Sequence, residues 1–182
     1  MSLNSQTFAI ERRLIDKLQI KEMVFVLVFS VLLQLLIHLI PSGNVPLGAQ
    51  LLPLFYAPFI AVLFFRLHVG LAVALLSPLC NYLITGNPAP GILGIISIEL
   101  VFFVLLTKLF SKNKIIKYIN APVSFVLAMV FSSFAILLMP FLYTKGNSWA
   151  YFSNSIQNSV AGIMVLFIIN FAAIKLYQKI RK

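Results

Sequence analysis

The chain contains little charge and almost no acid. Of its 182 residues, four are Asp or Glu and 10% are charged, whereas 61% are hydrophobic and the mean hydropathy is +1.02. A soluble domain carries about 25% charged residues, so this chain has too few to cover itself with a polar surface. We therefore expect it to lie in a lipid bilayer.

Cysteine and histidine are also scarce. Cys80 is the only cysteine, which excludes an internal disulfide and a cysteine-based metal cluster. The two histidines, His38 and His68, are expected on opposite sides of the membrane, which excludes a two-histidine metal site. The sequence also lacks a glycine-rich phosphate loop, a Ser–His triad and a carboxylate pair. We therefore expect no enzyme activity, no metal, no cofactor, and no ATP use by this chain alone.

Long, continuous apolar runs predict helices rather than strands as the membrane spans. Six spans are predicted, over Met23–Ile40, Leu47–Phe65, Leu67–Ile84, Gly91–Phe110, Val123–Tyr143 and Ser155–Tyr177. Each is close to the ~20 residues that cross ~30 Å of hydrocarbon. Arg66 alone separates the second span from the third, which predicts a tight helical hairpin. The alternative is one long bent helix, which would give five spans.

Lysine and arginine alternate along the chain with the predicted spans. The N-terminal segment has four, Arg66 adds one, the loop over Lys108–Lys117 has four and the C-terminus has four, whereas the intervening loops have only Lys145. Basic loops stay in the cytoplasm, so both termini are predicted to be cytoplasmic, in the inner membrane of a bacterium. The net charge of +10 does not predict nucleic-acid binding, because the basic residues lie at helix ends.

The N-terminal segment, residues 1–22, is polar and basic. Phe8, Ile15 and Leu18 recur at roughly helical spacing, which predicts a cytoplasmic segment with an amphipathic helix on the membrane surface. Residues 23–182 are predicted to form one six-helix membrane domain.

Polar side chains recur in the predicted outer halves of four spans. They are Gln34 and His38 in the first span, Ser77 and Asn81 in the third, Glu99 in the fourth, and Gln157 and Asn158 in the sixth. Hydrogen bonding between neighbouring helices is the alternative role for the amides and the serine, and His38 can be an interfacial side chain. The inner halves are almost purely apolar, with Asn170 as the main exception.

Glu99 is the only acidic residue in the predicted spans. An ionisable group at that depth costs at least ~2.5 kcal/mol and faces the bundle interior or a wet cavity, so the first hypothesis is a functional site. A carboxylate there favours a ligand that is cationic, or neutral with hydrogen-bond donors. Trp149, near the outer interface, is expected either to anchor the chain there or to stack on the ligand.

The middle of the chain resembles the substrate-binding S components of energy-coupling factor (ECF) vitamin transporters. The matching residues are Gly48-Ala49, Leu52-Pro53, Ala57-Pro58, Ala61, Gly70, Leu76-Ser77-Pro78-Leu79, Asn81 and Thr85-Gly86-Asn87-Pro88. The resemblance implies a six-helix bundle that captures a vitamin from outside, in a pocket below the loop between spans one and two. It also implies a transmembrane coupling subunit and two cytoplasmic ATPase subunits as partners.

The chain departs from that family in its first span. Many members carry an Ala-x-x-x-Ala pattern there for docking the coupling subunit, but this span contains no alanine. Small-residue pairs occur instead at Ala57/Ala61 and Gly70/Ala74, and these are the predicted docking residues. The alternative function is a structural membrane protein of a cell-shape complex, resembling MreD-like proteins, with no small-molecule substrate.

Overall fold

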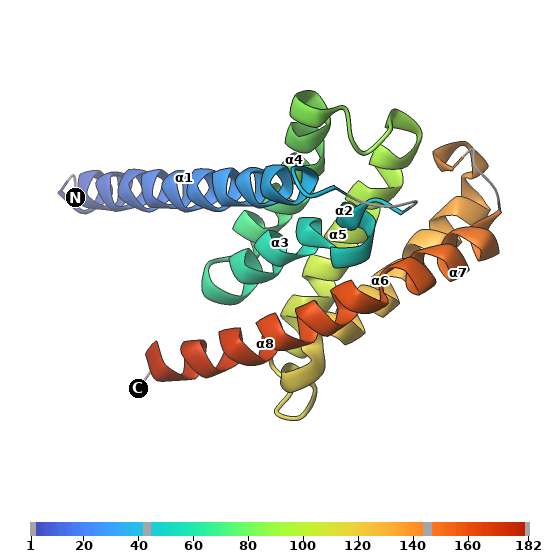
Figure 1. Cartoon of the computed structure of the whole chain (residues 1–182). Coiled ribbons are helices and arrows are strands. Elements are labelled where there is room, and N and C mark those ends of the chain that lie inside the picture. The colour runs from blue at the N-terminus through green and yellow to red at the C-terminus, as the bar shows by residue number, and fades with distance from the viewer. Residues whose placement is uncertain (1–2, 42–44, 144–146, 181–182) are drawn as a thin grey trace.

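The computed structural model describes residues 3–41, 45–143 and 147–180, and in these ranges the chain is helical without strands (Figure 1). Six of its helical segments are long and apolar enough to cross a membrane. They cover Ile20–His38, Leu47–Phe64, Leu67–Thr85, Pro90–Phe110, Ile116–Leu138 and Val160–Lys179. The prediction of an all-helical, six-span membrane protein is confirmed. The side of the membrane on which the termini lie stays a prediction.

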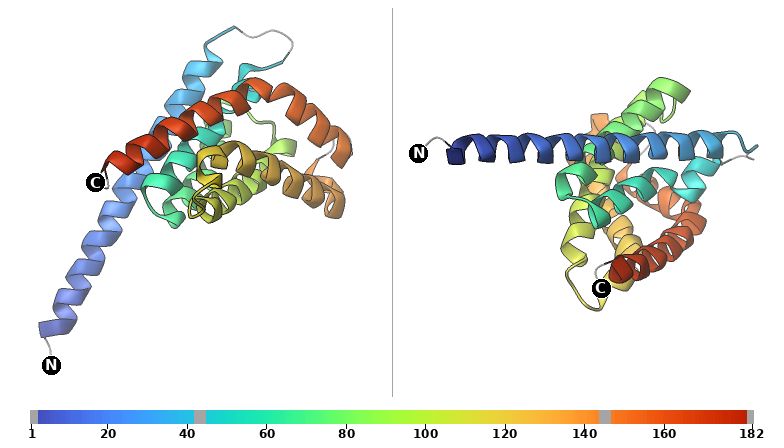
Figure 2. Two further views of the ribbon diagram at one scale, coloured as in Figure 1. Left: turned by 90° about the horizontal axis from the view of Figure 1, so that it is seen from below. Right: turned by 90° about the vertical axis from the view of Figure 1, so that its left-hand side faces the viewer.

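Helix α1 (Leu3–His38) is one continuous helix of 36 residues. At 1.5 Å per residue it is about 54 Å long, well beyond the ~30 Å of a hydrocarbon core. Its N-terminal half extends past the other helices (Figures 1 and 2). The predicted surface segment over residues 1–22 is thus continuous with the first span, and its location at a membrane surface stays a prediction.

The second span is interrupted at Leu52. Helix α2 (Leu47–Leu51) ends there, and α3 (Pro53–Phe64) begins at the next residue. Leu52 has a left-handed backbone, with φ 57°, which costs a non-glycine residue roughly 1–2 kcal/mol. Pro53 has no backbone N–H and disfavours helical conformation in the residue before it, which favours a break at this point.

The predicted hairpin between spans two and three is confirmed. Helix α3 ends at Phe64, and α4 (Leu67–Thr85) follows after an extended Arg66. The five-span alternative is therefore wrong. Helix α4 ends where Gly86 takes a left-handed φ of 73°, a conformation that glycine adopts without steric cost.

Helix α5 (Pro90–Phe110) is followed by a 3₁₀ turn, η1 (Ile116–Ile119), and then by α6 (Asn120–Leu138). The predicted fifth span continued to Tyr143, but α6 stops at Leu138. Pro140 cannot donate the hydrogen bond that would continue the helix, and it begins a second 3₁₀ turn, η2 (Pro140–Leu142), instead.

Another boundary difference lies in the sixth span, which was predicted to begin at Ser155. The structure has two helices in this region, α7 (Ser148–Asn158) and α8 (Val160–Ile180), separated at Ser159. Asn147 caps α7 by accepting a 2.8 Å hydrogen bond from the backbone N–H of Ala150. Only α8 has the length and hydropathy of a span.

The chain alternates between two ends of the bundle. At one end α4 finishes, α5 begins and α7 lies, and we call it the α7 end. The opposite end, which carries Arg66 and the segment from Lys108 to Lys117, is called the basic end. In Figure 1 both termini lie on the left, whereas α7 lies on the right.

Aromatic rings fill the centre of the bundle. Phe55 of α3 packs edge-to-face against Phe103 of α5 and Phe125 of α6, with ring centroids 5.1 and 4.9 Å apart. Leu166 of α8 and Phe59 are fully buried beside them. This core holds α3, α5, α6 and α8 together.

The four predicted docking residues lie inside the fold. Ala57, Ala61 and Ala74 are completely buried. A Cβ atom added at Gly70 would lie 3.0 Å from the Cβ of Val62. These small residues let α3, α4 and α5 approach closely, so in this structure they are not available to a partner subunit.

Candidate functional site

Glu99 is buried on α5, with 4% of its surface exposed. Its carboxyl group accepts a hydrogen bond of 2.6 Å from the Tyr151 hydroxyl. The Ser132 hydroxyl lies 3.5 Å from the same carboxyl group and shares its hydrogen with the Met129 carbonyl at 3.0 Å. The three side chains come from α7, α6 and α5. The carboxyl group therefore joins three helices at one point and has donors supplied by the protein itself.

Tyr151 reaches this position because α7 turns one side toward the bundle. It is the buried residue of α7, and it packs with Ile95 of α5 and Ile136 of α6. Its ring also contacts Tyr143 at 5.1 Å in an edge-to-face arrangement. Burial and the neighbouring Glu99 raise the pKa of Tyr151 well above its ordinary value, so the phenol keeps its proton and acts as the donor.

A second set of buried polar side chains lies on α1 and α4, two helices that pack against each other. Ser30 and Gln34 of α1 are 0% and 1% exposed, and Ser77 and Asn81 of α4 are 0% and 4% exposed. The Gln34 side-chain N–H donates to the Ser30 hydroxyl at 3.1 Å. We call these four residues the α1–α4 polar seam.

The packing of α1 on α4 explains why the seam forms. Val26 of α1 packs in one cluster with Val69 and Val73 of α4. The two helices run in the same direction, toward the α7 end, and residues four apart share a helix face. In α1, Ser30 and Gln34 lie one and two helical turns beyond Val26. In α4, Ser77 and Asn81 lie one and two turns beyond Val73.

Two atoms of the seam have no hydrogen-bond partner among the described residues. They are Gln34 Oε1 and Ser77 Oγ, and both are fully buried. A buried polar group without a partner costs about 1–3 kcal/mol. Such atoms are uncommon in folded proteins, and each one calls for a physical explanation.

The other predicted site residues are on the surface. His38, Trp149, Gln157 and Asn158 are all exposed. Glu99 makes no hydrogen bond to any of them, nor to Gln34 or Asn81, within the part of the chain that the structure describes. The structure thus buries three of the seven predicted residues, Gln34, Asn81 and Glu99, and divides them between the seam and the Glu99 cluster.

A contrasting polar group lies at the basic end. The Asn120 amide donates to the Thr107 carbonyl at 2.9 Å and accepts from the Ser124 hydroxyl at 2.9 Å. The Asn170 amide donates to the carbonyls of Tyr118, at 2.6 Å, and Lys117, at 3.1 Å. Its oxygen accepts from the Ala121 N–H at 3.4 Å. Both asparagines thus use their side chains to tie η1 and α6 to α5 and α8.

Sequence reasoning missed two residues that matter here. Tyr151 was not among the predicted site residues, and the polar run around Ser153–Ser155 was the available sign that a separate helix precedes α8. Nothing in the sequence indicated that Gly162 of α8 lies at a close contact between helices. A Cβ atom there would lie 2.6 Å from Leu52 Cγ and 2.7 Å from the Gln50 carbonyl oxygen, so this glycine allows α8 to contact the break between α2 and α3.

Comparison of the chain with protein-family models, with curated proteins and with solved structures found no match.

Proposed function

We propose that this protein is the substrate-binding subunit of an ECF-type uptake transporter in a bacterial plasma membrane. The proposal rests on the sequence resemblance around Leu76–Pro88 and on the six-span architecture. The observation that carries it is the pair of unpartnered buried atoms, Gln34 Oε1 and Ser77 Oγ. A bound small molecule that hydrogen-bonds to both atoms would explain why these polar groups are retained in an otherwise apolar helix contact.

The proposed ligand is neutral with hydrogen-bond donors, or cationic, as a thiamin-like or pyridoxine-like ring would be. In the orientation in which the Gln34 N–H donates to Ser30, Gln34 Oε1 is an acceptor and its partner is a donor. The Glu99 carboxyl group is also an acceptor, and Glu22, near the start of the first span, is the other carboxyl group in the spans. Both features favour a donor-rich ligand and disfavour an anion.

The proposed partners are a transmembrane coupling subunit and two cytoplasmic ATPase subunits, because the chain has no nucleotide-binding motif of its own. The chain reconstituted alone is then expected to bind its substrate without accumulating it. Accumulation of a solute by the lone chain under an ion gradient would contradict this part of the proposal.

The decisive experiment is mass spectrometry of small molecules released from the protein after purification. A donor-rich, vitamin-like molecule should be retained by the wild type and lost from Gln34→Met and Ser77→Ala. Thr107→Val is the matched control, because Thr107 Oγ1 is also buried without a partner but lies in the last turns of α5, toward the basic end. Equal retention by all variants would contradict the assignment of the seam as the binding site.

Glu99→Gln tests the charge of the ligand. The change keeps the shape of the side chain and removes its charge, so a cationic ligand should lose about 2–3 kcal/mol of binding free energy. A neutral ligand should lose much less. Binding is measured by titration calorimetry with the molecule identified by mass spectrometry, and tight binding of an anion would contradict the proposed ligand class.

One observation favours the structural alternative. Tyr151 and Ser132 supply the Glu99 carboxyl group with donors, so this cluster can hold α7 on the bundle without any ligand. A scaffold protein would retain no small molecule and would keep its partners after Gln34→Met. Co-purification of partner proteins with wild type and with this variant separates the two functions.

A further inference from the structure

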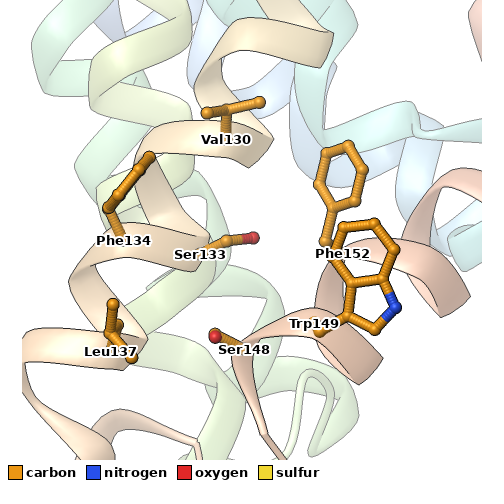
Figure 3. A pocket seen from close by; sticks show the side chains of 7 residues that line it. All are labelled: Val130, Ser133, Phe134, Leu137, Ser148, Trp149 and Phe152. Atoms are coloured by element: carbon orange, nitrogen blue, oxygen red, sulfur yellow. The ribbon is translucent and has the colours of Figure 1, made fainter.

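A groove lies between α6 and α7 on the outside of the bundle. It has a volume of about 340 Å³. Its lining consists of Val130, Ser133, Phe134 and Leu137 from α6 and Ser148, Trp149 and Phe152 from α7. Figure 3 shows the side chains of the two helices on either side of the opening, with Trp149 and Phe152 on one side and Phe134 and Leu137 on the other.

The groove wall is apolar in effect, although it contains serine. The Ser133 hydroxyl donates to the Met129 carbonyl at 2.8 Å, so its hydrogen is used within α6. Trp149 and Phe152 contact each other with ring centroids 5.9 Å apart. Water in such a groove would find few partners, whereas a hydrocarbon chain would find carbon on both sides.

The surface around the groove is one that must face lipid. Phe131, Phe134, Leu137 and Leu138 are all exposed on α6, and α6 belongs to a membrane span. The groove lines about two turns of that span, or ~10 Å, from Val130 to Leu137. Trp149, 72% exposed, lies on α7, which follows the end of this span, and indole rings prefer such a position at the membrane interface.

We propose that this groove binds one acyl chain of a bilayer phospholipid. The chain would lie along α6 from Leu137 toward Val130, with the headgroup beside the start of α7, where Ser148 and the exposed Asn147 are polar. Continuity of the groove with the lipid-facing side of α6 identifies the occupant as a lipid chain. The proposal does not depend on the transport function and would hold equally for a scaffold.

The experiment uses Trp149 as a probe, because it is the only tryptophan in the chain. The full-length protein is reconstituted in phosphatidylcholine vesicles that contain increasing fractions of phosphatidylcholine brominated on its acyl chains. Bromine quenches indole fluorescence on contact. A seated chain should give stronger quenching than the ordinary lipid boundary, with an apparent relative binding constant above one.

Ser133→Leu and the larger Ser133→Phe would fill the groove. Each should lower the relative binding constant toward one, because a filled groove offers a lipid chain no better van der Waals contact than the rest of the helix surface. Ser97→Leu is the matched control, because Ser97 makes the same kind of hydrogen bond, to the Leu93 carbonyl at 2.9 Å, on α5. Each variant is compared with its own fluorescence in unbrominated lipid, and its fold is checked by circular dichroism.

Reduced quenching in both Ser133 variants, with unchanged quenching in the control, would support the proposal. Equal quenching in wild type, Ser133→Leu and Ser133→Phe would show that Trp149 senses only ordinary boundary lipid and would overturn it. Quenching that depends on protein concentration rather than on brominated lipid would also overturn it, because a second copy of the chain would then occupy the groove.

Discussion

The polar groups at the two ends of the bundle are built differently. At the basic end, the Asn120 and Asn170 side chains bond mainly to backbone carbonyls of neighbouring segments. Near the α7 end, Glu99 bonds to two other side chains, and the α1–α4 polar seam leaves Gln34 Oε1 and Ser77 Oγ without partners. The two asparagine side chains find partners within the protein, whereas the two seam oxygens have none among the described residues, a state that Thr107 Oγ1 shares at the basic end.

This difference separates structural polar groups from candidate functional ones more clearly than depth or residue type does. An asparagine that satisfies backbone carbonyls at a helix junction stabilises the fold directly. A buried amide or hydroxyl oxygen without a partner lowers stability, and a hydrogen bond from a ligand would offset that loss. The following substitutions test the distinction by measuring how much each end depends on its polar groups.

The largest effect is expected for Asn170→Leu at the basic end. This change leaves the carbonyls of Lys117 and Tyr118 and the N–H of Ala121 without their side-chain partner. The free energy of unfolding should fall by about 2–4 kcal/mol, since three backbone groups lose a hydrogen bond at once. Asn154→Leu, at an exposed position of α7, is the control in thermal unfolding followed by circular dichroism. Similar melting of the two variants would mean that the basic end does not depend on this network.

Gly162→Ala tests whether the α7 end also depends on close packing. The added methyl group would lie under 3.0 Å from atoms of Gln50, Leu51 and Leu52, so α8 or the break at Leu52 has to shift. We expect a loss of about 1–3 kcal/mol, as for other overpacked sites. Gly48→Ala is the matched control in α2, because a methyl group there meets nothing within 4 Å. Equal stability of the two variants would show that Gly162 of α8 does not pack closely against residues 50–52.

Tyr151→Phe should have a smaller effect, because it removes one hydrogen bond and keeps the buried ring. The expected loss is about 1–2 kcal/mol, concentrated in α7, so amide hydrogen exchange should speed up in Ser148–Asn158 more than elsewhere. Tyr143→Phe preserves the ring contact between Tyr143 and Tyr151 and serves as the control. Unchanged exchange in α7 would mean that the hydrogen bond to Glu99 does not hold this helix on the bundle.

The smallest effect on stability is expected for Ser77→Ala and Gln34→Met. Both remove an oxygen that has no partner in the described structure, and Gln34→Met also removes the hydrogen bond to Ser30. The free energy of unfolding without ligand should therefore change by no more than about 0.5 kcal/mol in Ser77→Ala and fall by about 1 kcal/mol in Gln34→Met. A loss as large as that of Asn170→Leu would show that the seam is structural, and the contrast between the two ends would then disappear.

The polar residues of the spans show where prediction from sequence succeeded and where it stopped. Glu99 was recognised because an isolated acid stands out in an apolar segment. Gln157 and Asn158 were assigned to the same site, but the polar run that contains them belongs to α7, and both side chains are exposed. Helical spacing describes the face of one helix, and it does not tell which neighbouring helix lies opposite that face.

The small residues show the same limit. Ala57, Ala61, Gly70 and Ala74 were predicted to contact a partner because small residues let helices approach closely. That reasoning about close approach holds, but the helices that approach belong to this chain, because α3, α4 and α5 pack on these residues. A small-residue pair indicates a close contact without identifying the other side of it.

The sequence by itself determined the solvent, the number of spans and their helical form. In a bilayer each backbone N–H and C=O group needs a partner nearby in the chain, so apolar length alone implies a helix. Only the tertiary structure decided the contact of Tyr151 with Glu99, 52 residues away, and the close approach of Gly162 to Leu52. Such contacts depend on how helices rotate and cross when they pack, and the period of a single helix carries no information about that.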